Sequence, residues 1–374
     1  MAANSLEQPT PKGAAAVAPA TAAAPLPVSG LAEVTIVILN YNGAHFLRQF
    51  LPGVLRHADG ARVVVADNAS TDDSLGLLRT DFPAVEVLAF QENLGFCEGY
   101  NQALARLDSP YFVLLNSDVE VQAGWVRPLY ELLHANPRIA AVQPKVLAYD
   151  NPTLFEHAGA GGGYLDELGY PFCRGRLFDT LETDHGQYND PRPVAWASGA
   201  CCLVRATAWR DLGGFEPAFF AHMEEIDFCW RAQNAGHEIW YHGGGTVHHV
   251  GGGTLPKTNP HKTYLNFRNG LALLFKNTAP GELASFLILR VLLDWVAGLR
   301  FLAAGSWQEA RAVGRAHLHF IMRLGYWRRR RRLAKPHLLA GQRPGTYKGS
   351  LVWAYFAQGK KQFSQLSSGK DKKL

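Results

Sequence analysis

The chain has 374 residues, of which 47% are hydrophobic and 18% are charged. This composition is that of a globular protein with an ample core, and it excludes an intrinsically disordered chain. The length allows one large domain with an appendage, or two domains. The net charge is +5, but residues 281–374 hold 18 Lys and Arg against 4 Asp and Glu, and the residues before them carry a net charge of −9. This asymmetry predicts that the basic end contacts a polyanion, either a membrane surface or nucleic acid.

Residues 1–30 form an Ala/Pro-rich segment, which we expect to be disordered because it has too little apolar bulk to offset its ordering entropy. The segment lacks the basic start and the long apolar core of a signal peptide. The five cysteines are odd in number and lack the spacing of metal ligands, so we expect reduced cysteines in a cytosolic compartment.

Between residues 34 and 118, apolar runs alternate with polar turns and with segments of helical periodicity. Four runs have the character of strands, at 34–39, 63–66, 85–88 and 111–115, and the last of them has that of a strand buried on both faces. This rhythm predicts a doubly wound parallel sheet. The polar residues that follow the strands are then expected on one rim of the sheet, where such folds bind ligands, and they are Asn40, Asp67, Asn93 and Asn116.

Asp118 closes the polar turn Asn116-Ser117-Asp118 after the fourth run. A carboxylate at this end of a buried strand lies at the mouth of the ligand crevice. A hard cation that carries a diphosphate needs an oxygen ligand in that place. The alternative is an Asx turn without any ligand, which is the structure of most such strings.

A second acidic group begins a segment of helical periodicity that stops at Gly236, and it consists of Glu224, Glu225 and Asp227. Carboxylates at a helix start interact favourably with the helix dipole, which is the ordinary explanation for such a group. Farther along the chain, His248 and His249 stand in glycine-rich surroundings, where histidine rarely serves as core packing.

Four segments resemble, in this order and spacing, the nucleotide-sugar half of family 2 glycosyltransferases: VTIVILNYNG, VVVADNASTDDS, NLGFCEGYN and VLLNSDVEV. The later segment GGFEPAFFAHMEEIDFCWRAQNAGH is similar to the acceptor half of the same family. The resemblance covers roughly residues 33–275, and the pattern is most similar to bacterial rhamnosyltransferase-like enzymes of polysaccharide assembly. It implies a GT-A fold, in which the doubly wound α/β sheet is mixed.

The resemblance implies that the rim of the sheet binds a nucleoside-diphosphate sugar. Asp67 takes the position that contacts the base or the ribose, with a helix cap as its alternative role. The other positions expected to line the nucleotide pocket are Asn40, Asn42, Asn93, Gly95 and Asn116. For Asn93 and Gly95, a purely structural turn is the alternative.

The resemblance also implies roles for the acidic groups. Asn116-Ser117-Asp118 stands where the family has Asp-x-Asp, so Asp118 is the expected ligand of Mg2+ or Mn2+. Glu225 takes the place of the general base, with Glu224 as the alternative because the family's usual residue is Asp. His249 fits a histidine that ligates the metal or hydrogen-bonds the diphosphate. Further positive charge near the diphosphate, or else a solvated basic face, is expected from Lys257, Lys262 and Arg268.

Residues 283–304 form an apolar run of membrane-spanning length that is interrupted by Arg290, Asp294 and Arg300. On a helix these charges share one side, which describes a helix lying in the membrane interface better than one crossing it. Aromatic residues stand beside five successive arginines at 328–332, which suits an anionic leaflet, with a solvated charge run as the alternative. No nucleic-acid fold motif accompanies the arginines, so we expect no nucleic-acid partner.

We therefore expect a disordered tail at 1–30, a GT-A glycosyltransferase domain at 31–278 and a basic, helical, membrane-associating extension at 279–374. The expected activity is metal-dependent, inverting transfer of a sugar, with rhamnose as one expected sugar, from a nucleoside-diphosphate donor to a hydroxyl of a glycan or lipid-linked glycan. The expected location is cytoplasmic, with peripheral attachment to the inner face of the cell membrane. Two alternatives are a nucleotidyltransferase-like enzyme and a non-catalytic carbohydrate- or membrane-binding module.

Overall fold

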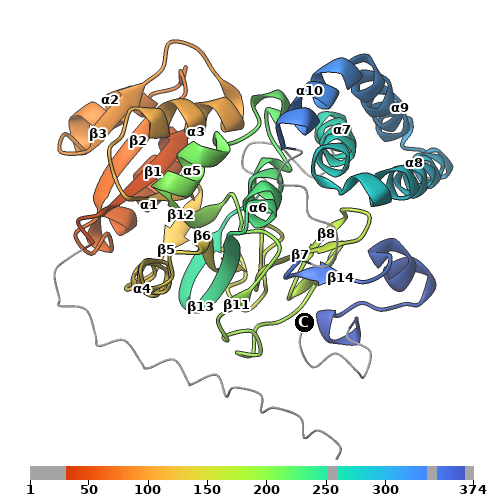
Figure 1. The fold of residues 1–374 in the computed structure, drawn as a ribbon. Helices are drawn as coiled ribbons and strands as arrows, with labels where there is room; N and C mark the ends of the chain where they lie inside the picture. Colours follow the sequence, from red (N-terminus) through yellow and green to blue (C-terminus); the bar gives the residue numbers. More distant parts are fainter. Residues whose placement is uncertain (1–30, 252–258, 335–342, 367–374) are drawn as a thin grey trace, which may run out of the picture.

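A computed structural model describes residues 31–251, 259–334 and 343–366 of the chain (Figure 1). The expectations for residues 1–30 and for Lys257 lie outside the described residues.

A mixed sheet of nine strands forms the centre of the described structure, in the order β11-β13-β6-β12-β4-β1-β2-β3, with β5 paired to β13. Three of these strands are β5 (Val119–Val121), β11 (Arg192–Pro193) and β13 (Glu238–His249). The four predicted strands are confirmed as β1 (Val34–Asn40), β2 (Arg62–Asp67), β3 (Glu86–Ala89) and β4 (Tyr111–Asn116). Within this group, β1 pairs in parallel with β2 and with β4, and β2 pairs in parallel with β3. The sheet becomes mixed at β12 (Cys201–Arg205), which runs antiparallel to β4 and to β6 (Ile139–Ala148).

Helices cover both faces of this sheet, which explains why central strands such as β1 and β4 are buried along almost their whole length, whereas β3 at the edge is only partly buried. Ile36 and Ile38 contribute to one hydrophobic cluster, whereas Val37 between them contributes to another. The first face is covered by α1 (Ala44–Arg56), α2 (Ser74–Asp81) and α4 (Arg127–Ala135). The second face is covered by α3 (Gly95–Ala105), α5 (Ala206–Leu212) and α6 (Glu224–Asn234).

A smaller sheet adjoins the central one and includes strands from two distant parts of the chain. Its order is β10-β9-β8-β7-β14, with bounds β7 (Gly163–Asp166), β8 (Pro171–Cys173), β9 (Arg176–Leu177), β10 (Thr180–Leu181) and β14 (Thr346–Tyr347). β14 pairs with β7 in parallel, and the Leu351 N–H donates to Asp166 Oδ2 at 2.8 Å. The end of the chain is thus joined to the region around residues 150–200, where the sequence contains no readable motif.

Four helices, α7 (Pro260–Asn277), α8 (Pro280–Ala303), α9 (Trp307–Met322) and α10 (Leu324–Ala334), gather in one layer next to α6 (Figure 1). Two of the three charges that interrupt the apolar run of α8 face the protein: Arg290 and Asp294 are buried, and Arg290 Nε donates to Asp294 Oδ1 at 2.8 Å. The third, Arg300, is exposed, which corrects the expectation that all three charges share one side. The apolar side of α8 is consequently the exposed side. The predicted domain boundary at residue 278 falls between α7 and α8, and α8, α9 and α10 all contact α7. The boundary therefore stays a prediction.

No helix within the described ranges has the length and apolar character needed to cross a bilayer.

Candidate active site

The carboxyl ends of three parallel strands bring polar residues to one rim of the central sheet. Asn40 at the end of β1 is paired in register with Asp67 at the end of β2, and Leu39 is paired with Asn116 at the end of β4. The side chain of Asn68 extends this rim to the next turn, since its Nδ2 donates to Asn93 Oδ1 at 3.0 Å.

Asp67 is completely buried, and both of its carboxylate oxygens accept hydrogen bonds from the protein. Oδ1 accepts from the Ser70 N–H and Oδ2 accepts from Asn40 Nδ2, both at 2.9 Å. Asn40 Oδ1 is buried without a hydrogen-bond partner among the described residues, and a Cβ on Gly43 would lie 2.4 Å from it. Asp67 therefore shapes the rim, and its contact with a nucleoside stays a prediction.

The remaining predicted pocket residues hold the turns on either side of the rim. Asn42 is exposed and lies in the left-handed region at φ 51, and its Oδ1 accepts from the Thr71 N–H at 2.7 Å. Asn93 Oδ1 accepts from the Gly95 N–H at 2.9 Å. Gly95 has φ 72, and a Cβ there would lie 2.6 Å from the ring of Phe220, so this close approach needs glycine. Gly95 thus brings the start of α3 against the segment that precedes α6.

Asp118 and His249 are brought together by pairing between two strands. His249 ends β13 (Glu238–His249) opposite Val119 of β5 (Val119–Val121), and its Nε2 lies 3.3 Å from Asp118 Oδ1. The other ring nitrogen, Nδ1, lies 3.1 Å from Glu156 Oε2. Burial alone would lower the pKa of His249, but its hydrogen bonds with Asp118 and Glu156 outweigh burial and raise the pKa to about 10.

The chemistry of this group fits a divalent cation. Asp118 offers a carboxylate oxygen and His249 offers Nε2, while Glu156 holds the second ring nitrogen, as outer carboxylates do for histidine ligands. Oxygen and imidazole ligands together suit Mn2+ or a similar ion. Within the described residues, no group of three or more His, Cys, Asp or Glu side chains is arranged to hold an ion. An ion bound by these two side chains would therefore need phosphate or water oxygens to complete its coordination.

The segment before Glu224 has an unusual backbone. Phe220, His222 and Met223 have φ values of 66, 68 and 71, in the left-handed region that bulky residues rarely adopt. Such strain persists only where the surroundings enforce it, and it occurs frequently at functional sites. Here it places Glu224 and Glu225 at the first turn of α6.

Helix α7 enforces this conformation through two neighbouring side chains. Asn269 Nδ2 donates to the carbonyl oxygens of Phe219, Ala221 and His222 at 3.1, 2.9 and 2.8 Å. Arg268 Nη2 donates to the carbonyl oxygens of Ala218 and Phe219, each at 2.9 Å. The buried Arg268 guanidinium is thus committed to the backbone, which corrects the expectation that it supplies charge to a diphosphate.

Three polar side-chain atoms without a hydrogen-bond partner among the described residues lie on this short segment: His222 Nε2, Glu224 Oε2 and Glu225 Oε2. Burial raises the pKa of Glu225 to about 7. Burial and the neighbouring Glu225 carboxyl raise the pKa of Glu224 further. Burial, helped by the charges of Lys262 and His261, lowers the pKa of His222 to about 4. The segment therefore offers a neutral imidazole and two carboxyl groups of weakened acidity.

Glu225 is connected to the end of β4 through a small-residue turn. A Cβ on Gly199 would lie 3.8 Å from the Glu225 Cβ, and the next carbonyl, that of Ala200, accepts from the Asn116 N–H at 3.0 Å. Glu225 also lines a small internal cavity with apolar neighbours such as Leu114 and Phe228, which explains its weak solvation. A larger cavity lies elsewhere, between α8 and α10.

Residues 35–213 match the family model described as "Glycosyl transferase family 2". The chain carries a family 2 glycosyltransferase domain. Its sequence is 27% identical over 216 residues to N-acetylglucosaminyl-diphospho-decaprenol L-rhamnosyltransferase of Mycobacterium tuberculosis. The aligned region covers 54% of this chain and 70% of that relative. It is also 30% identical over 236 residues to the pre-mycofactocin glycosyltransferase of the same organism, and this aligned region covers 59% of this chain and 44% of that relative.

The glycosyltransferase also has the predicted GT-A fold. It is similar to the crystal structure of GalNAc-T7 with UDP, GalNAc and Mn2+, with a TM-score of 0.51 and 14% sequence identity, over 66% of this chain and 48% of that one. Together with the mixed sheet, this similarity confirms the fold expected from the motifs.

Sequence reasoning missed Glu156 and Asn269 in this glycosyltransferase. Glu156 lies in the region without a readable motif, and Asn269 lies in the middle of a helix, where an amide side chain carries no local signal. His222, the third residue before Glu225, was also not singled out. It lies inside the segment that resembles the acceptor half of the family, and this membership is the signal that could have drawn attention to it.

Asn269→Ala is expected to destabilise the glycosyltransferase by about 1–3 kcal/mol, because it leaves the carbonyl oxygens of Ala221 and His222 in the strained segment without their donor. It should also slow sugar transfer, because the segment sets the position of α6. Thermal unfolding and initial rates measure the two effects. Asn266→Ala on the same helix is the matched control, and equal losses in both variants would contradict a specific role for Asn269.

Proposed function

We propose that this glycosyltransferase moves a sugar from a nucleoside-diphosphate donor to a hydroxyl group of a glycan or lipid-linked glycan, with inversion at the anomeric carbon. One observation carries the proposal. The Glu225 carboxyl has a raised pKa and an oxygen without a hydrogen-bond partner in the described structure, and it lies beside the turn that contacts the end of β4. A general base needs these properties.

The proposed reaction is a single displacement. The acceptor oxygen forms a bond to the anomeric carbon as the bond from that carbon to the diphosphate breaks, and the hydroxyl proton passes to the ionised Glu225 carboxylate. Asp118 and His249 would hold a divalent cation, which stabilises negative charge on a leaving diphosphate. Glu156 keeps the His249 ring in orientation, and Asn40 and Asp67 shape the rim on which the nucleoside rests.

Rhamnose is the proposed sugar, supported by the relative that is described as an L-rhamnosyltransferase and is 27% identical to this chain. A lipid-linked acceptor is supported in the same way, because that relative is described as acting on a diphospho-decaprenol.

The test is a screen of nucleotide sugars against the purified protein with a lipid-linked glycan acceptor, with and without Mn2+. We expect release of nucleoside diphosphate, a product of inverted anomeric configuration by NMR, and a higher rate with Mn2+. A product that retains the donor's configuration would contradict the single displacement, and transfer of a nucleotidyl group would replace the proposal with the nucleotidyltransferase alternative.

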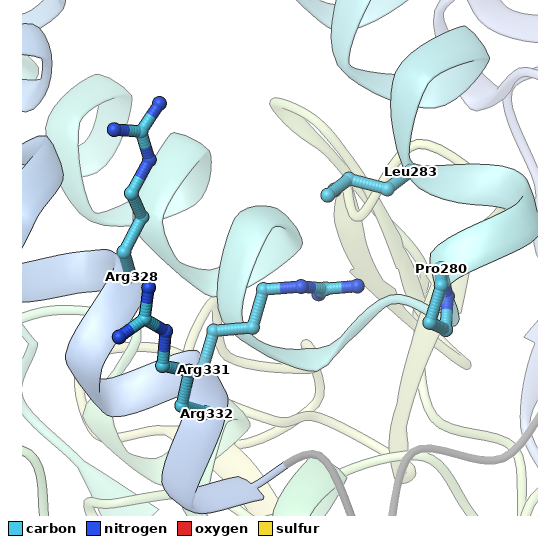
Figure 2. Close-up of a pocket in the computed structure, with 5 residues that line it drawn as sticks. All are labelled: Pro280, Leu283, Arg328, Arg331 and Arg332. Carbon is cyan, nitrogen blue, oxygen red and sulfur yellow. The ribbon is translucent and has the colours of Figure 1, made fainter.

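We further propose that the helical layer rests on the anionic, cytoplasmic face of the cell membrane. Large apolar side chains of α8 that are between 49% and 64% exposed are Ile288, Leu289, Leu292, Trp295, Val296, Leu299 and Leu302. Arg328 and Arg332 line a groove beside Leu283 and Pro280 (Figure 2). Apolar side chains near exposed arginines suit a surface of acyl chains and phosphate groups.

Replacement of both Leu292 and Leu299 by Glu is expected to weaken binding to vesicles containing phosphatidylglycerol at least about tenfold, because each change removes apolar area from the lipid contact. Co-sedimentation measures the effect. Leu55→Glu on α1, where Leu55 is 38% exposed, is the control. Equal binding of the double variant and the wild type would contradict a membrane contact through α8.

A further inference from the structure

The run of five arginines on α10 is divided by its contacts. Arg328, Arg329 and Arg332 are exposed, whereas Arg330 and Arg331 are half-buried. Arg331 Nη1 donates to the carbonyl oxygens of Phe275 and Thr278 at 2.6 and 2.7 Å, at the end of α7. Figure 2 shows Arg331 extending from α10 toward Pro280 and Leu283, while Arg328 points away from them. Two of the five cations therefore serve contacts within the protein.

Arg330 reaches a carboxylate that has no exposure to solvent. Its Nε donates to Glu216 Oε2 at 2.7 Å, and the Glu216 side chain is 0% exposed. The hydroxyl of Tyr326, one turn earlier on α10, donates to Glu216 Oε1. Lys276 Nζ of α7 donates to Glu216 Oε2 as well, at 2.7 Å. Glu216 thus joins α10 and α7 to the segment that leads into α6.

Lys276 connects this group to the helix of the proposed base. Its Nζ donates to Asp227 Oδ2 at 3.0 Å, and Asp227 is also completely buried. Asp227 lies two residues after Glu225, in the first turn of α6. Arg231 Nε and Asn277 Nδ2 donate to the same carboxylate at 2.8 and 2.9 Å. Contacts of 3.0 Å or less therefore run without a break from the arginine-rich helix to the helix of the proposed base.

The charges in this chain of contacts depend on one another. Lys276 is shared between two buried carboxylates, and Arg330 is the second cation on Glu216. Without Arg330, Glu216 would be left with one cation that Asp227 also needs. Removing one partner from a buried charged network leaves the remaining charges poorly compensated, so the side chains and the helices that carry them shift.

We propose that Arg330 and Tyr326 are positioning residues for the catalytic helix: by holding Glu216 they fix Lys276, and through Lys276 and Asp227 they set the place of α6. This inference rests on the proposed role of Glu225 as the base. It gives the C-terminal helices a part in catalysis that is separate from their proposed contact with a membrane.

Arg330→Gln in the full-length protein is expected to lower kcat at least about tenfold while the donor KM stays within about twofold, because α6 is displaced but the nucleotide rim is not. Arg330→Lys keeps a charged donor and should recover most of the loss. Tyr326→Phe removes one hydrogen bond to Glu216 and should lower kcat by a smaller factor. All variants are assayed with a water-soluble glycan acceptor, so that the proposed membrane contact does not affect the rate. Under this condition Arg329→Gln, which removes the same charge from the exposed side of α10, should leave kcat unchanged.

Hydrogen exchange of residues 220–234 gives a second readout that needs no substrate. We expect faster exchange there in Arg330→Gln and in Tyr326→Phe, but not in Arg329→Gln. If the wild type transfers no sugar, the proposed function fails and the exchange data still decide the positioning role. Unchanged exchange in both Arg330→Gln and Tyr326→Phe, or equal losses of kcat in Arg330→Gln and Arg329→Gln, would overturn the inference.

Discussion

Glu225→Gln is expected to lower the rate of sugar transfer by about 10²–10⁴-fold while donor affinity stays within about twofold. The amide matches the carboxylate in shape but cannot accept the hydroxyl proton. The residues expected to bind the nucleotide lie at the ends of β1, β2 and β4, whereas Glu225 lies on α6, so we expect donor binding to be unchanged. Single-turnover rates and calorimetric titration with a nucleotide sugar measure the two quantities.

Glu224→Gln is the matched control for this experiment, because Glu224 is the adjacent carboxyl and is also buried. A small loss in Glu224→Gln beside a large loss in Glu225→Gln assigns the base to Glu225. The reverse pattern would assign the base to Glu224, and near-normal turnover in both variants would refute a glutamate base at this position.

The pH dependence of the wild type follows from the same carboxyl. Because burial raises the Glu225 pKa to about 7, the ionised base accumulates above that pH. We expect kcat/KM to fall about tenfold per pH unit below 7 and to level off above it. Stability runs the opposite way, because a folded-state pKa above the usual value of 4.5 penalises the folded protein as pH rises from 4.5 through 7. Glu225→Gln should therefore unfold at a higher temperature than the wild type at pH 8, but not at pH 4.

Asp118→Ala is expected to abolish stimulation by Mn2+ and to lower the rate by about 10²-fold or more, because it removes the only carboxylate proposed to contact the ion. It also removes a partner of His249, whose Nε2 lies 3.3 Å from Asp118. Electron paramagnetic resonance of Mn2+ titrated into the protein with a nucleoside diphosphate reports ion binding without any turnover.

Glu120→Gln is the control for Asp118→Ala. Glu120 lies two residues away and pairs instead with His248, at 3.1 Å. Its replacement should leave the Mn2+ titration unchanged. If Mn2+ binds to Asp118→Ala and stimulates it as it does the wild type, Asp118 is not a ligand of the ion.

Much of the fold was predictable because local pattern determines it. The run 111–115 is apolar at every position and the run 34–39 at every position except Thr35, a pattern typical of strands covered on both faces. The polar residues after these strands also fell on one rim, because parallel strands place their carboxyl ends together. The family resemblance, and not spacing, implied that His249 ligates the metal of Asp118 or hydrogen-bonds the diphosphate, and the structure brings these two side chains together.

Side-chain partners were less predictable because they come from distant parts of the chain. Arg290 and Asp294 read as the polar side of a helix, and only the packed structure shows that this side faces inward. Arg330 and Arg331 are indistinguishable in sequence from their exposed neighbours, yet their partners lie on α7 and in the segment before α6. Periodicity gives the direction of a side chain on its own element, but not what lies opposite it.

A crystal structure of the Glu225→Gln variant with a nucleotide sugar and Mn2+ shows whether the donor, the cation and position 225 meet at one site. We expect the nucleoside on the rim at Asn40 and Asp67, the diphosphate with Mn2+ at Asp118 and His249, and the anomeric carbon facing position 225. A nucleotide bound elsewhere, for example in the arginine-lined groove between α8 and α10, would contradict this arrangement.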